Sequence, residues 1–338
     1  MFFQRTLLNI GCDTIKEPLY INSNGILYRK ENTLKFKNKE VDTSIPIHAI
    51  NEINCYGKVS LRSGAISLLQ KEKIIINFFN KYGYYEGSLY PKIALNSGVI
   101  VVKQALTYNN ENKRCFIAKE MVNGMKHNMI KTLKYYKKKG KDVDEHIQNL
   151  ENESILDGNI NRILSSEGKL WQSYYPSFDN ITKKFPIEKR EFKPPKNEMN
   201  SLISYGNSLL YTTTLSEIYH TYLHPSISFL HEPRERRFSL ACDLADIFKP
   251  LIISRTIFKL VNTNIINEKH FKKDVGVYLN EKGRQKFIQE YNNKLKTTIK
   301  HPQIKKKVSY RYLIRLEGYK LIKHILEDKT YESFKTWW

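Results

Sequence analysis

The spacing of apolar residues changes near residue 97, and this change divides the chain into two regions that fold in different ways. Before it, short β-prone segments are separated by turn residues such as Asn24-Gly25. The segments are Tyr20-Ile21, Ile26–Tyr28, Leu34–Phe36 and the apolar run Lys73–Phe79, after which Tyr82–Tyr85 turns into another strand. Strands of this length and spacing favour a small β-sandwich or a rolled sheet.

Beyond residue 97 the apolar residues recur at helical spacing in long amphipathic segments. These segments lie near 115–134, 155–175, 201–223, 239–261, 281–297 and 310–326. A basic turn at 137–141 separates two of them, and a Lys- and Pro-rich segment at 181–200 cannot form one helix and is expected to be a long loop. We therefore predict an α+β chain, with an N-terminal β-sandwich-like domain over 1–96 and a larger all-α domain over 97–338.

The charge of the chain indicates a polyanionic partner. Its 338 residues include 56 Lys and Arg against 34 Asp and Glu, a formal net charge of +22. Only +5 of this lies in residues 1–96 and +17 lies in the helical region, so that region is the expected polyanion binder. No apolar run approaches the roughly 18 residues that span a bilayer, so nucleic acid is favoured over a membrane. The scattered cysteines, with no C-x-x-C pair, suggest a reducing cytoplasm.

The residues best suited to chemistry lie between Phe229 and Pro250. Ser239 is a plausible helix N-cap, and Asp243 and Asp246 then lie side by side on one helical face, where His231 could approach them. Two adjacent carboxylates repel each other unless a cation lies between them. That cation could be a metal ion, or the aspartates could simply pair with nearby arginines, namely Arg234, Arg236 and Arg237.

Glu167 is a third candidate, on the helix that contains Leu164 and Trp171. Gly168 follows it, although a glycine inside a helix costs about 1 kcal/mol relative to alanine. Such a glycine is tolerated where a backbone packs closely or where a ligand approaches. From its pattern alone, an ordinary surface carboxylate is the favoured interpretation of Glu167.

Together these segments resemble the CRISPR-associated integrase, the metal-dependent DNase of spacer acquisition in CRISPR immunity. The resemblance is carried by Ser166-Glu167-Gly168, by Leu230–Pro233 and by the run Arg237–Pro250, and it extends to segments near both ends of the chain, at 18–27, 84–87 and 310–321. The chain is most similar in character to the type I, I-B-like branch. It departs from the family pattern at His224, Ser228, Lys249 and Ser254, and Asp246 stands where a glutamate is common.

The resemblance implies an N-terminal β-sandwich that forms homodimers and a C-terminal helical catalytic domain. It also implies a small ferredoxin-like partner protein, flanked by two such dimers. The metal ligands of the family map onto Glu167, His231 and Asp246, with Asp243 as a supporting carboxylate. His224 could be mistaken for the histidine ligand. His231 is preferred because the number of residues between it and the two aspartates fits the family.

Two carboxylates and one imidazole would suit Mg²⁺ or Mn²⁺ with several waters retained. Attack by a DNA 3′-OH would join prespacer DNA to the CRISPR repeat, whereas attack by water would cleave DNA. The expected phosphate contacts are Arg234, Arg236, Arg237, Lys249 and the loop lysines Lys183, Lys184 and Lys193. Tyr174 and Tyr175 could stack on a base or pack within the helical domain. The alternatives are a non-catalytic DNA-binding assembly subunit and a metal-dependent RNase.

Overall fold

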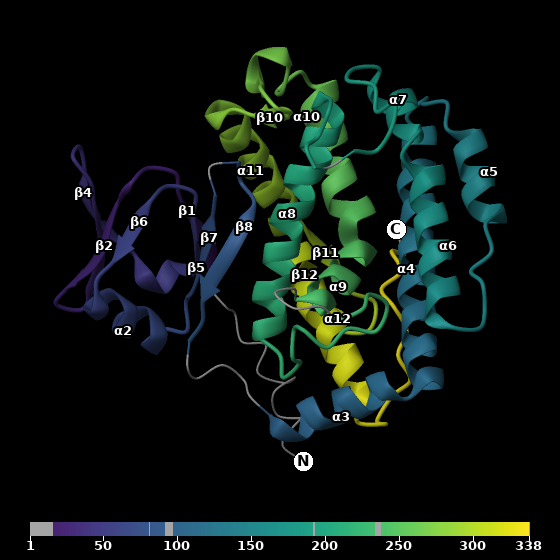
Figure 1. The fold of residues 1–338 in the computed structure, drawn as a ribbon, viewed down its shortest axis with the longest axis horizontal. Helices are drawn as coiled ribbons and strands as arrows, with labels where there is room; N and C mark the ends of the chain where they lie inside the picture. Colours follow the sequence, from purple (N-terminus) through teal and green to yellow (C-terminus); the bar gives the residue numbers. More distant parts are fainter. Residues whose placement is uncertain (1–15, 81, 92–96, 192, 234–237, 338) are drawn as a thin grey trace. The chain divides into compact units, whose positions relative to one another are not determined.

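The computed structural model describes residues 16–80, 82–91, 97–191, 193–233 and 238–337. The chain divides into two compact units, Met1–Ala94 and Leu95–Trp338. The sequence analysis places the change from strands to helices after residue 96. The chain is an α+β protein, with strands predominating in the first unit and helices in the second, as predicted (Figure 1).

The first unit contains two four-stranded sheets, with strand orders β1-β5-β7-β8 and β4-β3-β2-β6. The strands are β1 (Glu17–Ile21), β2 (Gly25–Lys30), β3 (Thr33–Lys37), β4 (Asp42–Ile45), β5 (Ile50–Cys55), β6 (Val59–Leu61), β7 (Ile75–Phe79) and β8 (Tyr85–Leu89). β5 pairs in parallel with both β1 and β7, which explains why Ile53, at its centre, is fully buried. The strands predicted at Tyr20, Leu27, Phe36 and Ile76 are therefore confirmed.

Both sheets contribute to one apolar core, which includes Leu27 and Leu34 from one sheet and Ile53 and Ile76 from the other. The prediction of strands alone was incomplete, because helix α2 (Ser63–Lys71) also packs Ala65, Leu68 and Leu69 into this core. A 3₁₀ turn, η1 (Ile47–Ala49), precedes β5.

The second unit is built mainly from helices, and the long segments predicted from the sequence are confirmed. The helices are α3 (Gly98–Asn109), α4 (Glu111–Lys137), α5 (Asp144–Asn152), α6 (Ile160–Tyr174), α7 (Ser177–Thr182), α8 (Glu198–Tyr219), α9 (Ser239–Lys249), α10 (Arg255–Asn262), α11 (Glu281–Lys296) and α12 (Tyr310–Ile325). A π-helical turn, η2 (Pro250–Ser254), joins α9 to α10. The basic turn follows the end of α4, and the Lys- and Pro-rich loop lies between α7 and α8.

The prediction of an all-α second domain was wrong in one respect, because two small antiparallel hairpins lie within it. They pair β9 (Phe271–Lys273) with β10 (Val277–Leu279) and β11 (Thr298–Lys300) with β12 (Lys307–Ser309), and a 3₁₀ turn, η3 (Glu268–His270), precedes β9. Each strand has three residues, which is too short for an alternating apolar pattern to stand out in the sequence.

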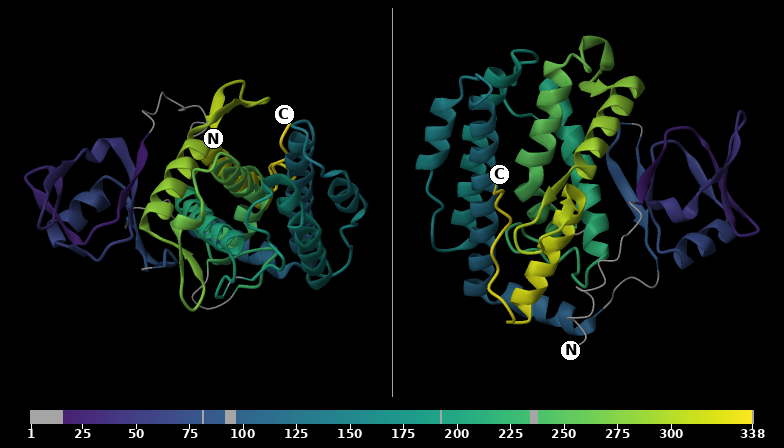
Figure 2. Two further views of the ribbon diagram at one scale, coloured as in Figure 1. Left: turned by 90° about the horizontal axis from the view of Figure 1, so that it is seen from above. Right: turned by 180° about the vertical axis from the view of Figure 1, so that it is seen from behind.

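Helix α9 lies within a set of packed helices: it contacts α4, α8 and α12, and α4 in turn packs against α6 (Figures 1 and 2). This packing brings α6 and α9, far apart in sequence, to the same region of the unit. The segment after α12 runs back along α4, where Asn128 accepts a hydrogen bond from the Thr336 backbone N–H at 2.9 Å. Gly124 makes this approach possible, since an added Cβ would lie 2.2 Å from the Ser333 hydroxyl. Of the helices in the described residues, none has the length and apolar character needed to cross a membrane.

Candidate metal and DNA site

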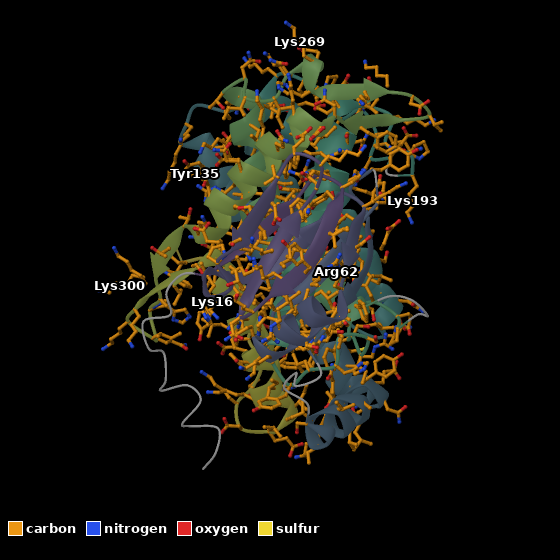
Figure 3. The ribbon with its side chains drawn as sticks, turned by 90° about the vertical axis from the view of Figure 1, so that its left-hand side faces the viewer. Lys16, Arg62, Tyr135, Lys193, Lys269 and Lys300 are labelled. Atoms are coloured by element: carbon orange, nitrogen blue, oxygen red, sulfur yellow. The ribbon has the colours of Figure 1, made fainter. Side chains whose placement is uncertain are left out.

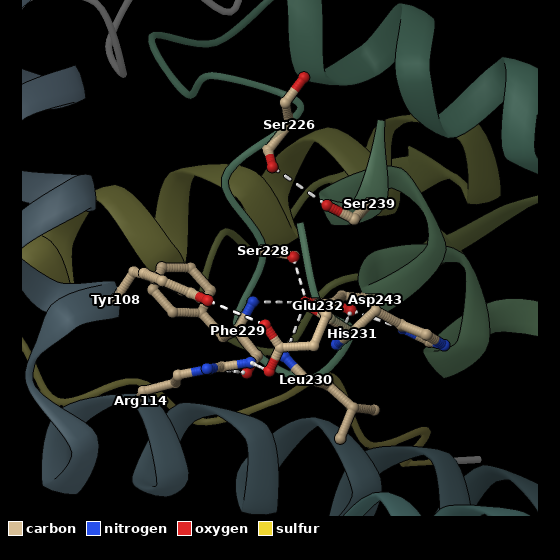
Figure 4. Close-up of polar contacts among 10 residues, drawn as sticks. All are labelled: Tyr108, Arg114, Ser226, Ser228, Phe229, Leu230, His231, Glu232, Ser239 and Asp243. Carbon is tan, nitrogen blue, oxygen red and sulfur yellow. Dashed lines mark hydrogen bonds and ion pairs between the residues drawn. The ribbon is translucent and has the colours of Figure 1, made fainter. Parts of the chain in front are cut away.

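Asp243 organises the turn that carries His231. It is fully buried on α9, and its two carboxylate oxygens accept four hydrogen bonds from this turn (Figure 4). Oδ2 accepts from the backbone N–H groups of Phe229 at 2.7 Å and Leu230 at 3.0 Å. Oδ1 accepts from the His231 backbone N–H at 3.0 Å and from its ring Nδ1 at 2.8 Å. Asp243 therefore holds both the backbone and the ring of His231.

This pairing also decides which ring nitrogen of His231 can bind a ligand. A carboxylate only accepts hydrogen bonds, so Nδ1 carries the proton and the lone pair of the neutral ring lies on Nε2. Burial alone would lower the pKa of His231, but the hydrogen bond and charge of Asp243, with the charges of Asp246 and Glu167, raise it above its usual value. A histidine held by a carboxylate in this way is typical of a metal ligand.

A second layer of contacts braces the same turn from α3 and α4 (Figure 4). Arg114 donates to the Phe229 carbonyl at 2.9 Å and to the Glu232 carboxylate at 2.7 Å. Tyr108 donates to the other oxygen of Glu232 at 2.9 Å. These roles could not be predicted from the sequence, because both residues lie more than a hundred positions from Glu232 and belong to no motif.

The start of α9 differs from the prediction for Ser239. Phe238 precedes the helix, and Ser239 is its first residue; instead of capping, its hydroxyl donates to the Ser226 carbonyl at 3.0 Å. The helix still presents Asp243 and Asp246 as expected from their spacing, and both are buried, with 0% and 4% of their surfaces exposed. The hydrogen bonds from the His231 turn orient Asp243, and Asp246 is buried and paired with Lys249, so neither carboxylate depends on a capping side chain.

The alternative that both aspartates pair with nearby arginines stays untested, because the arginines concerned lie outside the described residues. Asp243 is bonded to the His231 turn, and Asp246 forms an ion pair with Lys249, one turn further along α9. Arg234, Arg236 and Arg237, which were predicted to contact DNA phosphates, lie outside the described residues.

Glu167 is not an ordinary surface carboxylate. It lies on α6, half-buried, and burial followed by the charge of Asp246 raises its pKa to about 7. The charges of Lys249 and His231 act on it in the opposite direction. Glu167, Asp246 and His231 are thus within electrostatic range of one another, although the sequence separates them widely. Beside Glu167, a Cβ added to Gly168 would meet no atom within 4 Å in the described structure, so close packing does not explain the glycine.

Lys249 belongs to this cluster, since it faces Asp246 and not open solvent. Its ammonium lies 5.4 Å from the centre of the Trp171 ring, and its side chain is 22% exposed. Burial would lower the pKa of Lys249, but the adjacent Asp246 carboxylate raises it well above its usual value. Lys249 therefore pairs with Asp246, and its positive charge also acts on Glu167.

The donor set fits a divalent cation in type and in charge. Two carboxylates and one imidazole suit Mg²⁺ or Mn²⁺, and burial, followed by the charge of Asp246, raises the pKa of Glu167. The side chains are not gathered into one coordination sphere, however: within the described residues, no three His, Cys, Asp or Glu side chains lie close enough together to hold a metal ion. The positive charge that pairs with Asp246 in this structure is the ammonium of Lys249.

The other candidates separate into buried and exposed residues. Tyr174 is fully buried, packing edge-on against Phe178 at 5.6 Å between ring centres, so it cannot stack on a base. Tyr175 is half-buried and stacks on Trp171 at 5.2 Å. The side chains of Lys183, Lys184, Lys193 and His224 are exposed. His224 does not pair with Asp243 or Asp246 in the described residues.

The chain is similar along most of its length to proteins of one family. Residues 19–293 match the family described as CRISPR associated protein Cas1. The chain is 46% identical to CRISPR-associated protein Cas1 1 of Methanobrevibacter ruminantium, over 96% of this chain and 99% of the relative. It is 44% identical to CRISPR-associated endonuclease Cas1 of Clostridium perfringens, over 94% of this chain and 98% of the relative. A solved CAS1 protein from Thermotoga maritima has a TM-score of 0.84 and 39% identity, over 94% of this chain and 100% of that chain.

Proposed function

The chain belongs to the family of CRISPR-associated protein Cas1, and from this premise we propose that it is a divalent-metal-dependent DNA endonuclease and integrase. Its reaction would insert spacer DNA into a CRISPR array by attack of a DNA 3′-OH on a repeat phosphodiester. Relatives named as endonucleases support the nuclease activity. The single observation in this chain that carries the proposal is that Asp243 orients His231, whose charge interacts with the charges of Glu167 and Asp246.

Each residue of the cluster has a distinct part in this proposal. Glu167, Asp246 and Nε2 of His231 would hold Mg²⁺ or Mn²⁺, and Asp243 would keep the imidazole in the tautomer that leaves Nε2 available. When bound, the ion would polarise the scissile phosphate and assist ionisation of the attacking hydroxyl. Lys249 would leave Asp246 and turn toward the negative charge of the DNA backbone. Gly168 would leave room beside Glu167 for the DNA strand.

The remaining partners follow from the family. In this proposal the two sheets of the first unit close as a β-sandwich through which two copies form a homodimer. A small ferredoxin-like partner protein joins two such dimers, and the assembly acts on DNA in the cytoplasm as part of an I-B-like system. Phosphates would be contacted by Arg234, Arg236, Arg237 and the loop lysines, with Tyr175 close to the site.

A strand-transfer assay tests the proposal. Labelled prespacer DNA is incubated with supercoiled plasmid carrying the repeat, with Mn²⁺ and with the small partner. Glu167→Gln, His231→Ala and Asp246→Asn are each expected to reduce integrated product by about 100-fold or more, while DNA binding measured in EDTA stays within twofold of wild type. Glu145→Gln, an exposed carboxylate on α5, is the matched control and should integrate normally. Normal integration by one of the three variants would remove that residue from the site.

One observation favours a second candidate, a non-catalytic DNA-binding assembly subunit. Lys249 already neutralises Asp246, and the described carboxylates are not gathered for metal binding. This candidate predicts DNA binding that EDTA does not change and no strand-transfer product with any divalent ion. The integration assay with wild-type protein therefore separates the two functions.

A further inference from the structure

A separate pocket with a cavity volume of about 640 Å³ lies in the helical unit, away from the candidate metal site. Its walls come from the C-terminal end of α4 with the turn that follows, from α10 and from α11. One carboxylate, that of Glu290, lines the pocket. Five cationic side chains line it as well: Lys139, Lys141, Arg255, Lys259 and Lys294. Pockets of this volume accommodate ligands of nucleotide size.

Most of the positive charge in this pocket is not neutralised by the protein. Glu290 forms its ion pair with Lys259, at 2.8 Å. Across the described parts of the chain, Lys139, Lys141, Arg255 and Lys294 form no ion pair with a carboxylate. Cations gathered without counter-charges favour an anionic ligand, because an anion would relieve their mutual repulsion.

Aromatic rings hold three of these cations in place. The Arg255 guanidinium lies 4.2 Å from the centre of the Tyr135 ring, and the Lys139 ammonium lies 4.9 Å from the same point. The Lys294 ammonium lies 4.0 Å from the centre of the Tyr310 ring. Cation–π contacts of this kind position a charge without cancelling it, so the pocket is preorganised for an anion.

Burial, and after it the nearby positive charge, disfavours the charged form of Lys294. Burial and then the charge of Arg255 lower the pKa of Lys294 to about 7, and Glu290 opposes this shift only in part. The hydrogen bond from Lys139 lowers the pKa of Tyr135.

Packed rings separate this pocket from the candidate metal site. Tyr136 and Phe258, which line the pocket, meet at 5.0 Å, and behind them Phe258 packs on Phe178 at 4.6 Å. Phe178 in turn contacts the buried Tyr174 of α6. None of the pocket residues belongs to the Glu167, His231 and Asp246 cluster, so the two sites can be tested independently.

We propose that this pocket binds a nucleotide phosphate, with Arg255, Lys139, Lys141 and Lys294 as its cationic contacts. Arg255 supplies the planar guanidinium fork that matches phosphate oxygens, and the amide side chains of Asn262 and Asn293 supply further donors and acceptors for a sugar or base. The phosphate could belong to a DNA strand or to a free mononucleotide. Phosphate binding in this pocket requires neither a metal ion nor strand transfer.

The test measures binding in EDTA with two probes, dTMP by calorimetry and a labelled single-stranded dT20 oligonucleotide by fluorescence anisotropy. Arg255→Gln and Lys294→Met are expected to weaken binding of at least one probe by about 10-fold, and to lower the salt dependence of oligonucleotide binding by about one phosphate contact. Weakened dTMP binding identifies a free nucleotide as ligand, and weakened dT20 binding alone identifies a strand phosphate.

Lys269→Gln is the charge-matched control, since this exposed lysine lies on the same unit away from the pocket (Figure 3). It should bind both probes within twofold of wild type, and Arg255→Lys should retain part of the affinity. If Arg255→Gln or Lys294→Met lowers the thermal midpoint markedly, the exposed Lys139→Gln provides the same reading without disturbing packing. The proposal would be overturned if the pocket variants bound both probes with the same affinity as Lys269→Gln.

Discussion

Replacing Asp243 by asparagine should both destabilise the helical unit and release His231. The carboxylate accepts four hydrogen bonds, two on each oxygen. An asparagine keeps one oxygen and turns an NH₂ group toward the other two donors, which lose their acceptor in a buried site. Hydrogen bonds to a charged group contribute about 1.5–3 kcal/mol each, so the loss of two gives an upper bound of about 6 kcal/mol. Because the turn can relax, we expect about 3 kcal/mol, or a fall of about 6–12 °C in Tm.

Chemical denaturation of wild type and Asp243→Asn measures this difference in EDTA. Asp179→Asn is the matched control: Asp179 Oδ1 accepts a single backbone hydrogen bond, from Ile187 at 2.9 Å, which an asparagine oxygen can keep, so its cost should stay below about 1 kcal/mol. An NMR titration adds a reading specific to His231. Asp243 raises the pKa of His231, so the variant should titrate at lower pH. Equal stability of the two variants, with an unchanged His231 titration, would refute the positioning role.

Three further perturbations test other features of the structure. The pKa of Glu167 is raised from 4.5 to about 7, so its ionised form is disfavoured in the folded state and stability is lost as pH rises through this range. Glu167→Gln should therefore be more stable than wild type by about 1–3 kcal/mol at pH 8 in EDTA and equal to it at pH 4; equal stability at both would contradict this. Burial would raise the pKa of Glu217, but Arg315 and Arg311 lower it to about 2, so its contribution is present above 4.5 and lost as pH falls toward 2. Glu217→Gln should cost about 3–5 kcal/mol at pH 7 by urea denaturation and much less near pH 2, and a pH-independent difference would argue against the ion pairs as its cause. Gly124→Ala should lower Tm because its Cβ would lie 2.2 Å from the Ser333 hydroxyl, whereas Gly168→Ala, with no atom within 4 Å, should raise stability by about 0.5–1 kcal/mol; the reverse order would contradict the packing described here.

The sequence predicted most of the fold because long periodic segments carry a strong signal. Apolar residues at helical spacing identified α4, α6, α8, α11 and α12 to within a few residues. Helix α2 was missed although Ala65, Leu68 and Leu69 follow the i, i+3, i+4 pattern, because three positions among short strands are a weak signal. The three-residue hairpin strands gave no usable pattern, since their pairing depends on contacts between chain segments.

For the site, spacing predicted that Asp243 and Asp246 share a face of α9 and that His231 could approach them. It could not show that Asp243 accepts four hydrogen bonds from the His231 turn, since this depends on how the chain folds back onto α9. The pairing of Lys249 with Asp246, at i and i+3, could have been inferred from helix geometry. The bracing by Arg114 and Tyr108 could not, because these residues lie on other helices and outside any motif.

The most direct test of the account is a titration of Mn²⁺ into the metal-free protein, followed by electron paramagnetic resonance. The account predicts one ion bound per chain in the wild type, and loss of that ion in Glu167→Gln, His231→Ala and Asp246→Asn but not in the exposed control Glu145→Gln. Unchanged stoichiometry and affinity in all three variants would contradict the claim that these side chains hold one ion together.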